Sequence, residues 1–376
     1  MKKHLHIVCL DTPWPADYGG AIDMMNRIMT MKKANVAIHL HYFSYNERGV
    51  PTELNQYCES LHVYKRKKKQ NAVFSKLPYI VSSRINDELI KNLQKDNYPI
   101  LLEGLHCTGI LPYLNLKERK VVVRMHNEES TYYKELGEAE SAFLKKMYFL
   151  RESKLIKKYN HQLPNECVYA CVSTKDIEKL KEYYKLENVI AIPTFPSWQK
   201  VTSDEGLGTI CLYHGNLSVS ENEEAAIWLL KNVFSKIEKP FVIAGKNPSA
   251  RLQKMAHKYP HTCFVANPTD SELNDLIKKA QINILPSFNK KSTGIKLKLL
   301  HALFEGRHCL VNEQMVMGTG LETACHIAGN ADGFASVIMQ LYNLPFSNEE
   351  VLLRKRILED QFDNENNTRL LSPYLW

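Results

Sequence analysis

The chain has 376 residues, and its 49 Lys and Arg against 41 Asp and Glu give a formal net charge of +8. A composition of 44% hydrophobic and 24% charged residues is typical of a globular chain, and the length corresponds to about two domains of roughly 100–200 residues each. These values exclude a disordered or fibrous protein. The apolar stretches are shorter than the roughly 18–20 residues that cross a bilayer, and the first one ends at Asp11, so we expect a cytoplasmic protein without a secretory signal. The nine cysteines have no paired short spacings, which favours buried free thiols.

The first half of the chain alternates strand-like and helix-like segments. Residues 4–10 form a short β-prone run, residues 11–20 a turn-rich loop, and residues 21–33 a helical pattern before a strand at 36–42. Further strands are predicted at 61–64, 99–103, 121–125, 168–172 and 189–192, with helical patterns between most of them. Strands separated by helices pair in parallel through right-handed crossovers, so this half is predicted to be a doubly wound α/β sheet.

A second unit of the same kind follows a linker. Residues 195–207 contain prolines and a polar stretch without periodicity. Strands are then predicted at 209–213, 240–244, 262–265, 282–286 and 308–312, and helices at 223–237, 250–257, 271–280 and 296–305. We therefore expect an N-terminal Rossmann-like domain over 1–194, a linker over 195–207, a C-terminal Rossmann-like domain over 208–347, and a helix and tail over 348–376. The carboxyl ends of both sheets should face a central cleft that binds the ligands.

Two segments of the first half place polar groups at predicted strand ends. Gly19 and Gly20 close the loop after the first strand, where backbone N–H groups could approach a ligand at the helix start, although a plain turn is the alternative. The strand at 121–125 delivers Arg124, His126 and Asn127 at its carboxyl end. A histidine there can hydrogen-bond a sugar hydroxyl or accept a proton, and a loop-capping role is the alternative.

The second half offers a group of cations. Gly215 and Asn216 follow its first strand, and Lys246 follows its second. Lys296 and Lys298 begin a predicted helix, where the helix dipole disfavours cations, so the pair predicts a bound anion such as a diphosphate. Two solvated lysines that cover apolar surface are the alternative.

These motifs, taken together, resemble GT-B glycosyltransferases of the large retaining family 4, also called group 1. The resemblance rests on residues 213–217, 244–248, 264–286, 293–302 and 317–321 in the second half, and on 15–20 and 124–127 in the first. It implies donor-binding roles for one set of residues, namely Gly215, Asn216, Lys246, Thr293, Gly294, Lys296, Lys298, His301 and Glu305. It also implies catalytic roles for His126 and Lys298, and an acceptor or phosphate loop that contains Gly19, Gly20, Arg124 and Asn127.

The chain departs from the family pattern at two glutamate positions, which are Thr293 and His301 here. The second glutamate of the family accepts hydrogen bonds from the ribose, and a neutral histidine has one acceptor nitrogen where a carboxylate has two oxygens. Glu305 lies one helical turn beyond His301 and could replace it only if the nucleotide shifts. Asn216 stands where many relatives carry Arg, which leaves Lys246 and the two helix-start lysines for the diphosphate.

The resemblance implies an enzyme that moves a hexosyl group from a UDP- or GDP-linked sugar to a glycan or lipid-linked acceptor, with retention of configuration and without a metal or cofactor. A catalytically silent glycan- or partner-binding protein is the alternative. Peripheral membrane contact could come from the basic run at 65–69 or from the basic, aromatic-rich helix predicted at 142–159, although solvated faces are the alternative. Nucleic-acid binding is not expected, because no reader motif accompanies the charge.

Overall fold

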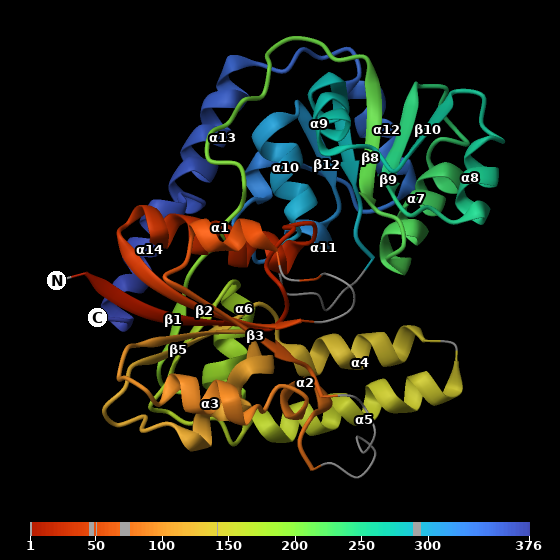
Figure 1. Ribbon diagram of the computed structural model, residues 1–376. Helices are drawn as coiled ribbons and strands as arrows, with labels where there is room; N and C mark the ends of the chain where they lie inside the picture. Colours follow the sequence, from red (N-terminus) through yellow and green to blue (C-terminus); the bar gives the residue numbers. More distant parts are fainter. Residues whose placement is uncertain (1, 45–48, 50, 68–75, 141, 289–294) are drawn as a thin grey trace. The chain divides into compact units, whose positions relative to one another are not determined.

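The computed structural model describes residues 2–44, 49, 51–67, 76–140, 142–288 and 295–376 (Figure 1). Contacts within the chain divide it into two compact units. Unit 1 contains the described residues of Met1–Ser197 together with Phe362–Trp376, and unit 2 contains those of Trp198–Lys290 and Ile295–Gln361. The last residues of the chain therefore belong to the unit in which the chain begins.

Unit 1 is a parallel α/β unit. Its strands are β1 (Lys3–Cys9), β2 (Val36–Ser44), β3 (Ser60–Lys65), β4 (Ile100–Glu103), β5 (Val121–Met125), β6 (Val168–Cys171) and β7 (Val189–Ala191). Its α-helices are α1 (Gly19–Lys33), α2 (Tyr79–Ser82), α3 (Asp87–Leu93), α4 (Glu129–Ala139), α5 (Phe143–Asn160), α6 (Thr174–Glu178) and α14 (Asn364–Leu371). Short 3₁₀ segments lie at η1 (Thr52–Gln56), η3 (Leu105–Tyr113) and η6 (Ser372–Tyr374), and one π-helical turn lies at η4 (Lys179–Tyr183).

The strands described in unit 1 form one seven-stranded sheet in the order β3-β2-β1-β4-β5-β6-β7, and each neighbouring pair is parallel. The chain builds outward in one direction from β1 and in the other from β4. The crevice beyond the carboxyl ends of β1 and β4 is therefore the topological switch point, where sheets of this kind bind ligands.

Helices cover both faces of this sheet. Consecutive strand residues point to opposite faces, so each strand contributes apolar side chains to both. Ile7 of β1 packs in a buried cluster with side chains of α1 and α14, whereas the next residue, Val8, packs in a second cluster with side chains of α2, α3 and α5. Figure 1 shows these two groups of helices on the two sides of the sheet. The apolar strand runs that predicted a parallel sheet in the sequence are buried for this reason.

Unit 2 repeats the architecture. Its strands are β8 (Ile210–Asn216), β9 (Phe241–Lys246), β10 (Thr262–Ala266), β11 (Ala280–Leu285), β12 (His308–Val311) and β13 (His326–Ile327). Its α-helices are α7 (Ser220–Asn232), α8 (Ala250–Ala256), α9 (Asp270–Lys279), α10 (Leu297–Glu305), α11 (Glu313–Val316), α12 (Ala331–Leu341) and α13 (Asn348–Gln361), and η5 (Glu322–Ala324) is a 3₁₀ turn. The sheet order over the described strands is β10-β9-β8-β11-β12-β13, all parallel, with its switch point between β8 and β11.

The fold class predicted from the sequence, two Rossmann-like parallel α/β units, is confirmed. The two-residue strand β13 is an addition that hydrophobic periodicity does not predict, because two residues carry no repeat. The C-terminal segment is a second addition: Leu371 and Leu375 pack in the cluster beside α1, and the Trp376 indole donates to the backbone carbonyl of His4 at 3.3 Å.

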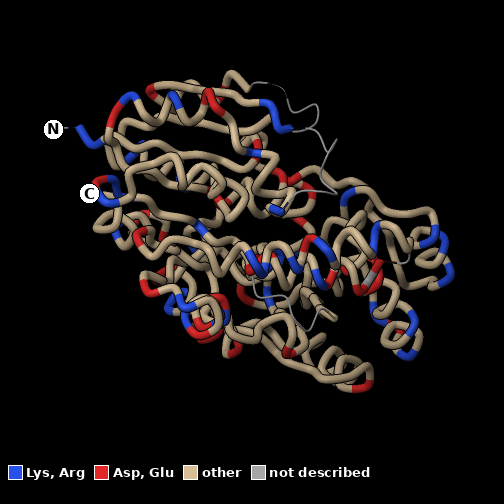
Figure 2. Tube along the Cα trace, turned by 90° about the horizontal axis from the view of Figure 1, so that it is seen from below, with Lys and Arg blue, Asp and Glu red and all other residues tan. Residues whose placement is uncertain are grey.

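The charge of the chain is distributed rather than gathered in one block, as Figure 2 shows for Lys and Arg against Asp and Glu. Among the helices in the described residues, none is long and apolar enough to cross a membrane. All nine cysteines lie within the described ranges and are free thiols, and most are buried, as expected.

Candidate functional site

The predicted donor residues of unit 2 gather at its switch point. Gly215 and Asn216 end β8, and the strand register pairs Asn216 with Lys246 at the end of β9. A Cβ atom on Gly245 would lie 2.1 Å from the carbonyl oxygen of Gly215, so only glycine lets the two strand ends approach this closely. The side-chain amide of Asn222, in the first turn of α7, donates to the carbonyl of Asn216 at 2.8 Å.

Lys298 lies in the first turn of α10 and points at the same place. Its Nζ donates to the Asn222 side-chain oxygen at 2.8 Å and lies 5.1 Å from the centre of the Tyr213 ring. Burial, with the like charge of Lys296 in support, lowers the pKa of Lys298 to about 7, although Glu221 acts in the opposite direction. An ammonium in this position gains from an anion, because a second negative charge would offset its desolvation.

Lys296 is the N-cap residue of α10 and is held by an acid. Its Nζ donates to Glu221 Oε1 at 2.7 Å, and the same oxygen accepts from the hydroxyl of Ser287, which follows β11, at 2.7 Å. Burial alone would raise the pKa of Glu221, but Lys296 and the hydroxyl hold that pKa below its usual value. Lys296 is therefore a paired cation, and Lys298 is the less compensated one.

His301 is neutral and oriented. Burial lowers its pKa to about 4, and its Nε2 donates to the side-chain oxygen of Asn274 on α9 at 2.7 Å. Trp198 stacks on the imidazole with ring centres 4.3 Å apart. Since Nε2 carries the proton, Nδ1 is the acceptor nitrogen, as a ribose hydroxyl would require.

Glu305 points into the contact between α10 and α9. Its side chain is largely buried, lies 3.8 Å from Lys278 Nζ, and has a pKa raised by burial. Asn274, the partner of His301, also hydrogen-bonds Glu305, and this bond lowers the pKa of Glu305 in opposition to burial. Glu305 is thus occupied by α9 in this arrangement.

The remaining predicted donor residues are spread more widely. Lys246 is exposed and lies 3.5 Å from the exposed Asp270 carboxylate. Thr293 and Gly294 lie outside the described residues. His214 was not singled out as a site residue, yet it is buried beside His301, its pKa is lowered well below the usual value by burial, and its Nε2 has no hydrogen-bond partner among the described residues.

Unit 1 contains a buried ionic network at its own switch point. Arg27 of α1 donates from Nε and Nη2 to both oxygens of Glu103 at 2.9 and 2.7 Å, and Nη2 also lies 2.8 Å from Asp23. Burial alone would raise the pKa values of both Asp23 and Glu103. Arg27 and Arg124 instead hold the pKa of Asp23 low, and Arg27 holds that of Glu103 low. The two carboxylates are therefore charged although they are buried.

Arg124 belongs to this network. Its guanidinium is buried and donates to the backbone carbonyls of Ile192 and Pro193 at 2.5 and 2.9 Å, with Asp23 at 3.4 Å. The sequence suggested a ligand-facing residue at this strand end, but the structure gives the donors of Arg124 to acceptors of unit 1. Its described contacts fix the segment after β7 against α1.

His126 follows β5 and lies between the two acids. Its Nε2 donates to Glu103 at 3.0 Å, and its Nδ1 lies 3.5 Å from Asp23. The ring remains partly exposed at the carboxyl end of β5, so an acid orients an imidazole that a ligand can reach. Asn127 is half-buried beside it, and Gly19 and Gly20 form the first turn of α1.

Sequence reasoning missed three members of this network, namely Asp23, Arg27 and Glu103. One signal was available: Asp23 and Arg27 are oppositely charged and four residues apart on a helix, which is the spacing of an ion pair. Their partner is 76 positions from Arg27 and has no such signal. Asp23, Glu103 and His126 also cluster closely enough for a metal, but two arginines already supply the positive charge that an ion would bring.

Two further acids, Glu128 and Glu129, follow His126 in the sequence and differ in their environments. Glu128 caps α4 and accepts from Lys179 and from Ser130, whereas the neighbouring Glu129 is buried. Burial, supported by the charges of Glu128 and Asp176, raises the pKa of Glu129 to about 8. Glu129 is therefore a protonated acid at neutral pH.

Comparison with known proteins gives a relative of similar length. The chain is 27% identical over 368 residues to a Klebsiella pneumoniae protein described as "Uncharacterized 44.6 kDa protein in cps region", and the match covers 94% of this chain and 89% of the relative. No protein-family model matches the chain.

Solved structures match over the whole length. A Staphylococcus aureus TarM mutant in complex with fondaparinux, alpha-GlcNAc-glycerol and UDP superposes with a TM-score of 0.68 at 11% identity and full coverage of both chains. OtsA, a trehalose-6-phosphate synthase, gives 0.60 at 10% identity with 99% coverage of each chain. A Burkholderia xenovorans α,α-trehalose-phosphate synthase (UDP-forming) in complex with glucose-6-phosphate gives 0.57 at 11% identity, also with 99% coverage of each. Identities this low show the fold, which is the GT-B fold of glycosyltransferases.

Proposed function

We propose that this protein is a glycosyltransferase that transfers a hexosyl group from a UDP- or GDP-linked donor to a glycan or lipid-linked acceptor in polysaccharide or glycoconjugate synthesis. One observation carries the proposal: Lys298, an under-compensated cation, lies at the switch point of unit 2 beside the end of β8 and the start of α7. Structural neighbours that share this fold include a UDP complex and a UDP-forming synthase.

The donor diphosphate would lie against Lys298, with Lys296 and Lys246 as further cations. Charge develops on the diphosphate as the glycosidic bond breaks, so a fixed cation there lowers the barrier. The N–H groups at the start of α7, next to Gly215 and Asn216, add a favourable dipole. The neutral His301 offers Nδ1 to a ribose hydroxyl.

Retention by front-side attack is part of the proposal and follows the resemblance to family 4. A double displacement needs a free carboxylate near the reacting carbon. Glu221, the acid beside the lysines, is instead engaged by Lys296 and Ser287. Leaving-group assistance from the diphosphate requires neither a nucleophilic carboxylate nor a metal, and we propose a metal-independent reaction on that basis.

In unit 1 we propose His126 as the residue that hydrogen-bonds the substrate. Glu103 orients its ring, and Arg27 fixes Glu103 in turn. Arg124 acts as a positioning residue through Asp23 and the backbone after β7. Gly19 and Gly20, in the first turn of α1, and Asn127 remain our candidates for contacts on the acceptor side.

Calorimetric titration with UDP and with GDP tests the proposal. One nucleotide should bind in the micromolar range, and Lys298→Met should weaken it whereas Lys254→Met, on the exposed face of α8, should not. A panel of nucleotide sugars then identifies the donor by nucleotide release. Failure of both nucleotides to bind at millimolar concentration would contradict the proposed enzymatic function and favour the catalytically silent binding protein.

The start of α5 supports a membrane-facing role for the acceptor side. Phe143, Leu144 and Met147 are 71, 81 and 53% exposed, and Lys145 and Lys146 lie among them. Large exposed apolar side chains beside lysines are typical of helices that rest on an anionic membrane surface. In the basic run at 65–69, Arg66 stacks on Tyr79, and Lys68 and Lys69 lie outside the described residues.

Vesicle sedimentation tests this contact. With anionic vesicles, the double variant Phe143→Ser, Leu144→Ser should bind at least about tenfold more weakly than the parent, since each buried side chain of this size contributes about 1.5 kcal/mol or more. Leu207→Ser, at an exposed leucine of unit 2, is the matched control. Equal binding of parent and double variant would remove α5 from the membrane surface.

A further inference from the structure

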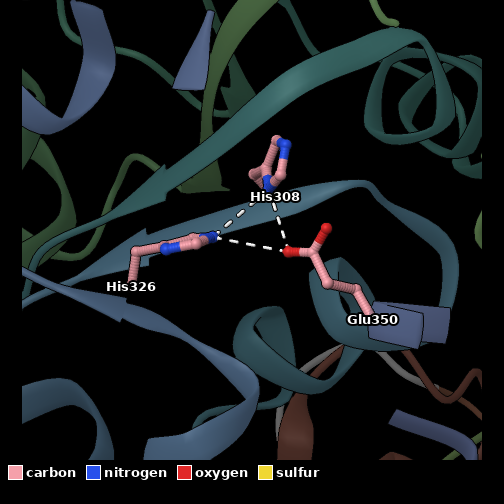
Figure 3. A group of neighbouring side chains, drawn as sticks. All are labelled: His308, His326 and Glu350. Atoms are coloured by element: carbon pink, nitrogen blue, oxygen red, sulfur yellow. Dashed lines mark hydrogen bonds and ion pairs between the residues drawn. The ribbon is translucent and has the colours of Figure 1, made fainter. Parts of the chain in front are cut away.

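A second group of polar side chains lies in unit 2, away from the proposed donor site. His308 begins β12, His326 begins β13, and Glu350 lies in the first turn of α13 (Figure 3). The donor residues lie beyond the carboxyl ends of the strands, whereas His308 marks the amino end of its strand. A four-residue strand separates the two edges by roughly 10 Å.

Three atoms converge in this group. His308 Nδ1 lies 3.2 Å from His326 Nε2 and 3.3 Å from Glu350 Oε1, and His326 Nε2 lies 3.7 Å from the same oxygen. Ligand atoms about 2.0–2.1 Å from a metal are separated by about 3.4 Å in a tetrahedral site and by about 3.0 Å on an octahedral face. The mean of the three distances, about 3.4 Å, matches the tetrahedral value.

The hydrogen-bonding partners leave too few protons for this arrangement. His308 Nε2 donates to the backbone carbonyl of Leu344 at 3.0 Å, so Nδ1 of the neutral ring is an acceptor. The carboxylate of Glu350 also only accepts. The 3.3 Å contact between them therefore joins two acceptors, and the single N–H that His326 can offer serves only one of them well.

Two of the three ligands, His308 and Glu350, are also oriented by groups behind them, as in protein metal sites. The Leu344 carbonyl fixes the His308 ring, and Phe346 packs edge-on against it with ring centres 5.2 Å apart. Glu350 Oε2 accepts from the backbone N–H of Ser347 at 3.0 Å, which turns Oε1 toward the imidazoles.

One nearby charge opposes a cation. Arg354 lies one turn beyond Glu350 on α13 and is buried. Its guanidinium donates to the backbone carbonyls of Leu303, Gly306 and Arg307. The Glu350 carboxylate therefore remains directed at the two imidazoles. The Arg354 charge lowers the affinity for a dication without removing a ligand.

We propose that His308, His326 and Glu350 bind one divalent transition-metal ion, Zn²⁺ by ligand type and geometry, with water as the fourth ligand. Side-chain exposures of 0, 35 and 30% leave His308 inside and open the other two ligands to solvent, which provides both an entry path and a place for that water. The ion would fasten the N-terminus of α13 to the short edge strand β13. This role is structural and goes beyond the proposed transfer reaction.

Titration of the chelator-treated full-length chain with ZnCl₂ tests the proposal, with Co²⁺ absorption as the reporter of geometry. We expect one equivalent to bind, with the intense visible bands of tetrahedral Co²⁺, and the melting temperature to rise. His326→Gln and Glu350→Gln should each weaken Zn²⁺ binding by at least about tenfold, since even residues behind the ligands contribute that much. His257→Gln, at an exposed histidine just after α8, should bind as the parent does.

The two ligand variants replace partly exposed side chains, and melting curves recorded without metal show whether they fold. Stoichiometric binding that both variants lose and the control keeps supports the site. Absence of binding at one equivalent, or equal affinities in the parent and His326→Gln, overturns it and leaves a hydrogen-bonded histidine pair. None of these readouts depends on sugar transfer.

Discussion

The pH dependence of nucleotide binding should report the charge state of Lys298. Burial and Lys296 lower the pKa of this lysine to about 7, against its usual value of 10.5. In the free protein at pH 8, about nine-tenths of this group is therefore neutral, and at pH 6 about nine-tenths is charged. A bound diphosphate favours the charged form, so binding at pH 8 must include proton uptake.

The size of the effect follows from that pKa. Charging the lysine costs about 1.4 kcal/mol at pH 8 and less than about 0.1 kcal/mol at pH 6, so this group alone should weaken UDP or GDP binding about tenfold between the two pH values. Lys298→Met should lose a charged hydrogen bond worth about 1.5–3 kcal/mol at pH 6. The variant should also lose the proton uptake of about 0.9 per nucleotide expected from this lysine at pH 8.

Calorimetry in buffers of different ionisation enthalpy measures both quantities. The free nucleotide phosphate titrates near pH 6 and is already deprotonated at pH 8, so the difference in proton uptake between parent and variant at pH 8 reports the lysine. Lys254→Met controls for net charge. If parent and Lys298→Met take up the same number of protons at pH 8, or bind the nucleotide equally at pH 6, Lys298 is not the diphosphate ligand.

Three further predictions concern unit 1. Glu129→Gln should flatten the dependence of stability on pH. A carboxyl whose pKa rises from 4.5 to about 8 on folding stabilises the protein below pH 4.5, and that contribution, up to about 5 kcal/mol, is lost as pH rises to 8. If the free energy of urea unfolding changes equally for parent and variant between pH 5 and 8, this prediction is wrong. Arg27→Met should cost about 3–5 kcal/mol of unfolding free energy, because Asp23 and Glu103 would be left buried without compensation; a loss below about 1 kcal/mol in urea titrations would show that the network relaxes. His126→Asn should lower turnover by about 10–100-fold while nucleotide affinity stays within about twofold, as expected for the loss of one substrate hydrogen bond of about 1.5–3 kcal/mol, and equal loss of both would make its role structural.

Much of the fold could be predicted from the sequence. The buried strands of parallel sheets read as short apolar runs, and helical patterns lay between most of these runs, so parallel pairing through right-handed crossovers follows from general rules. The elements that escaped prediction lack such a repeat. Strand β13 has two residues, and the return of α14 to unit 1 depends on contacts of Leu371 and Leu375 with residues at the start of the chain.

The candidate site was predictable where local rules place side chains. Gly215, Asn216 and Lys298 lie at a strand end or in the first turn of a helix, and the switch point brings them together, whereas Lys246 ends the neighbouring strand β9 and is exposed. Which cation is compensated was not predictable, because the partner of Lys296 is Glu221, 75 positions away.

The buried ion pairs and the proposed metal ligands were not predictable from the sequence for the same reason. Glu103 faces Arg27 across 76 positions, and His308 meets His326 and Glu350 only through sheet and helix packing. No spacing in the sequence encodes those meetings. They arise because parallel strands bring distant residues to one edge, and only the folded chain shows which side chains meet there.

The position of a bound nucleotide tests the central claim most directly. A crystal structure of the protein soaked with UDP or GDP should show the diphosphate within about 3 Å of Lys298 Nζ, beside the end of β8 and the start of α7, and a ribose hydroxyl on His301 Nδ1. A nucleotide bound elsewhere in the molecule, with Lys298 still on Asn222, would contradict the assignment of unit 2 as the donor-binding unit.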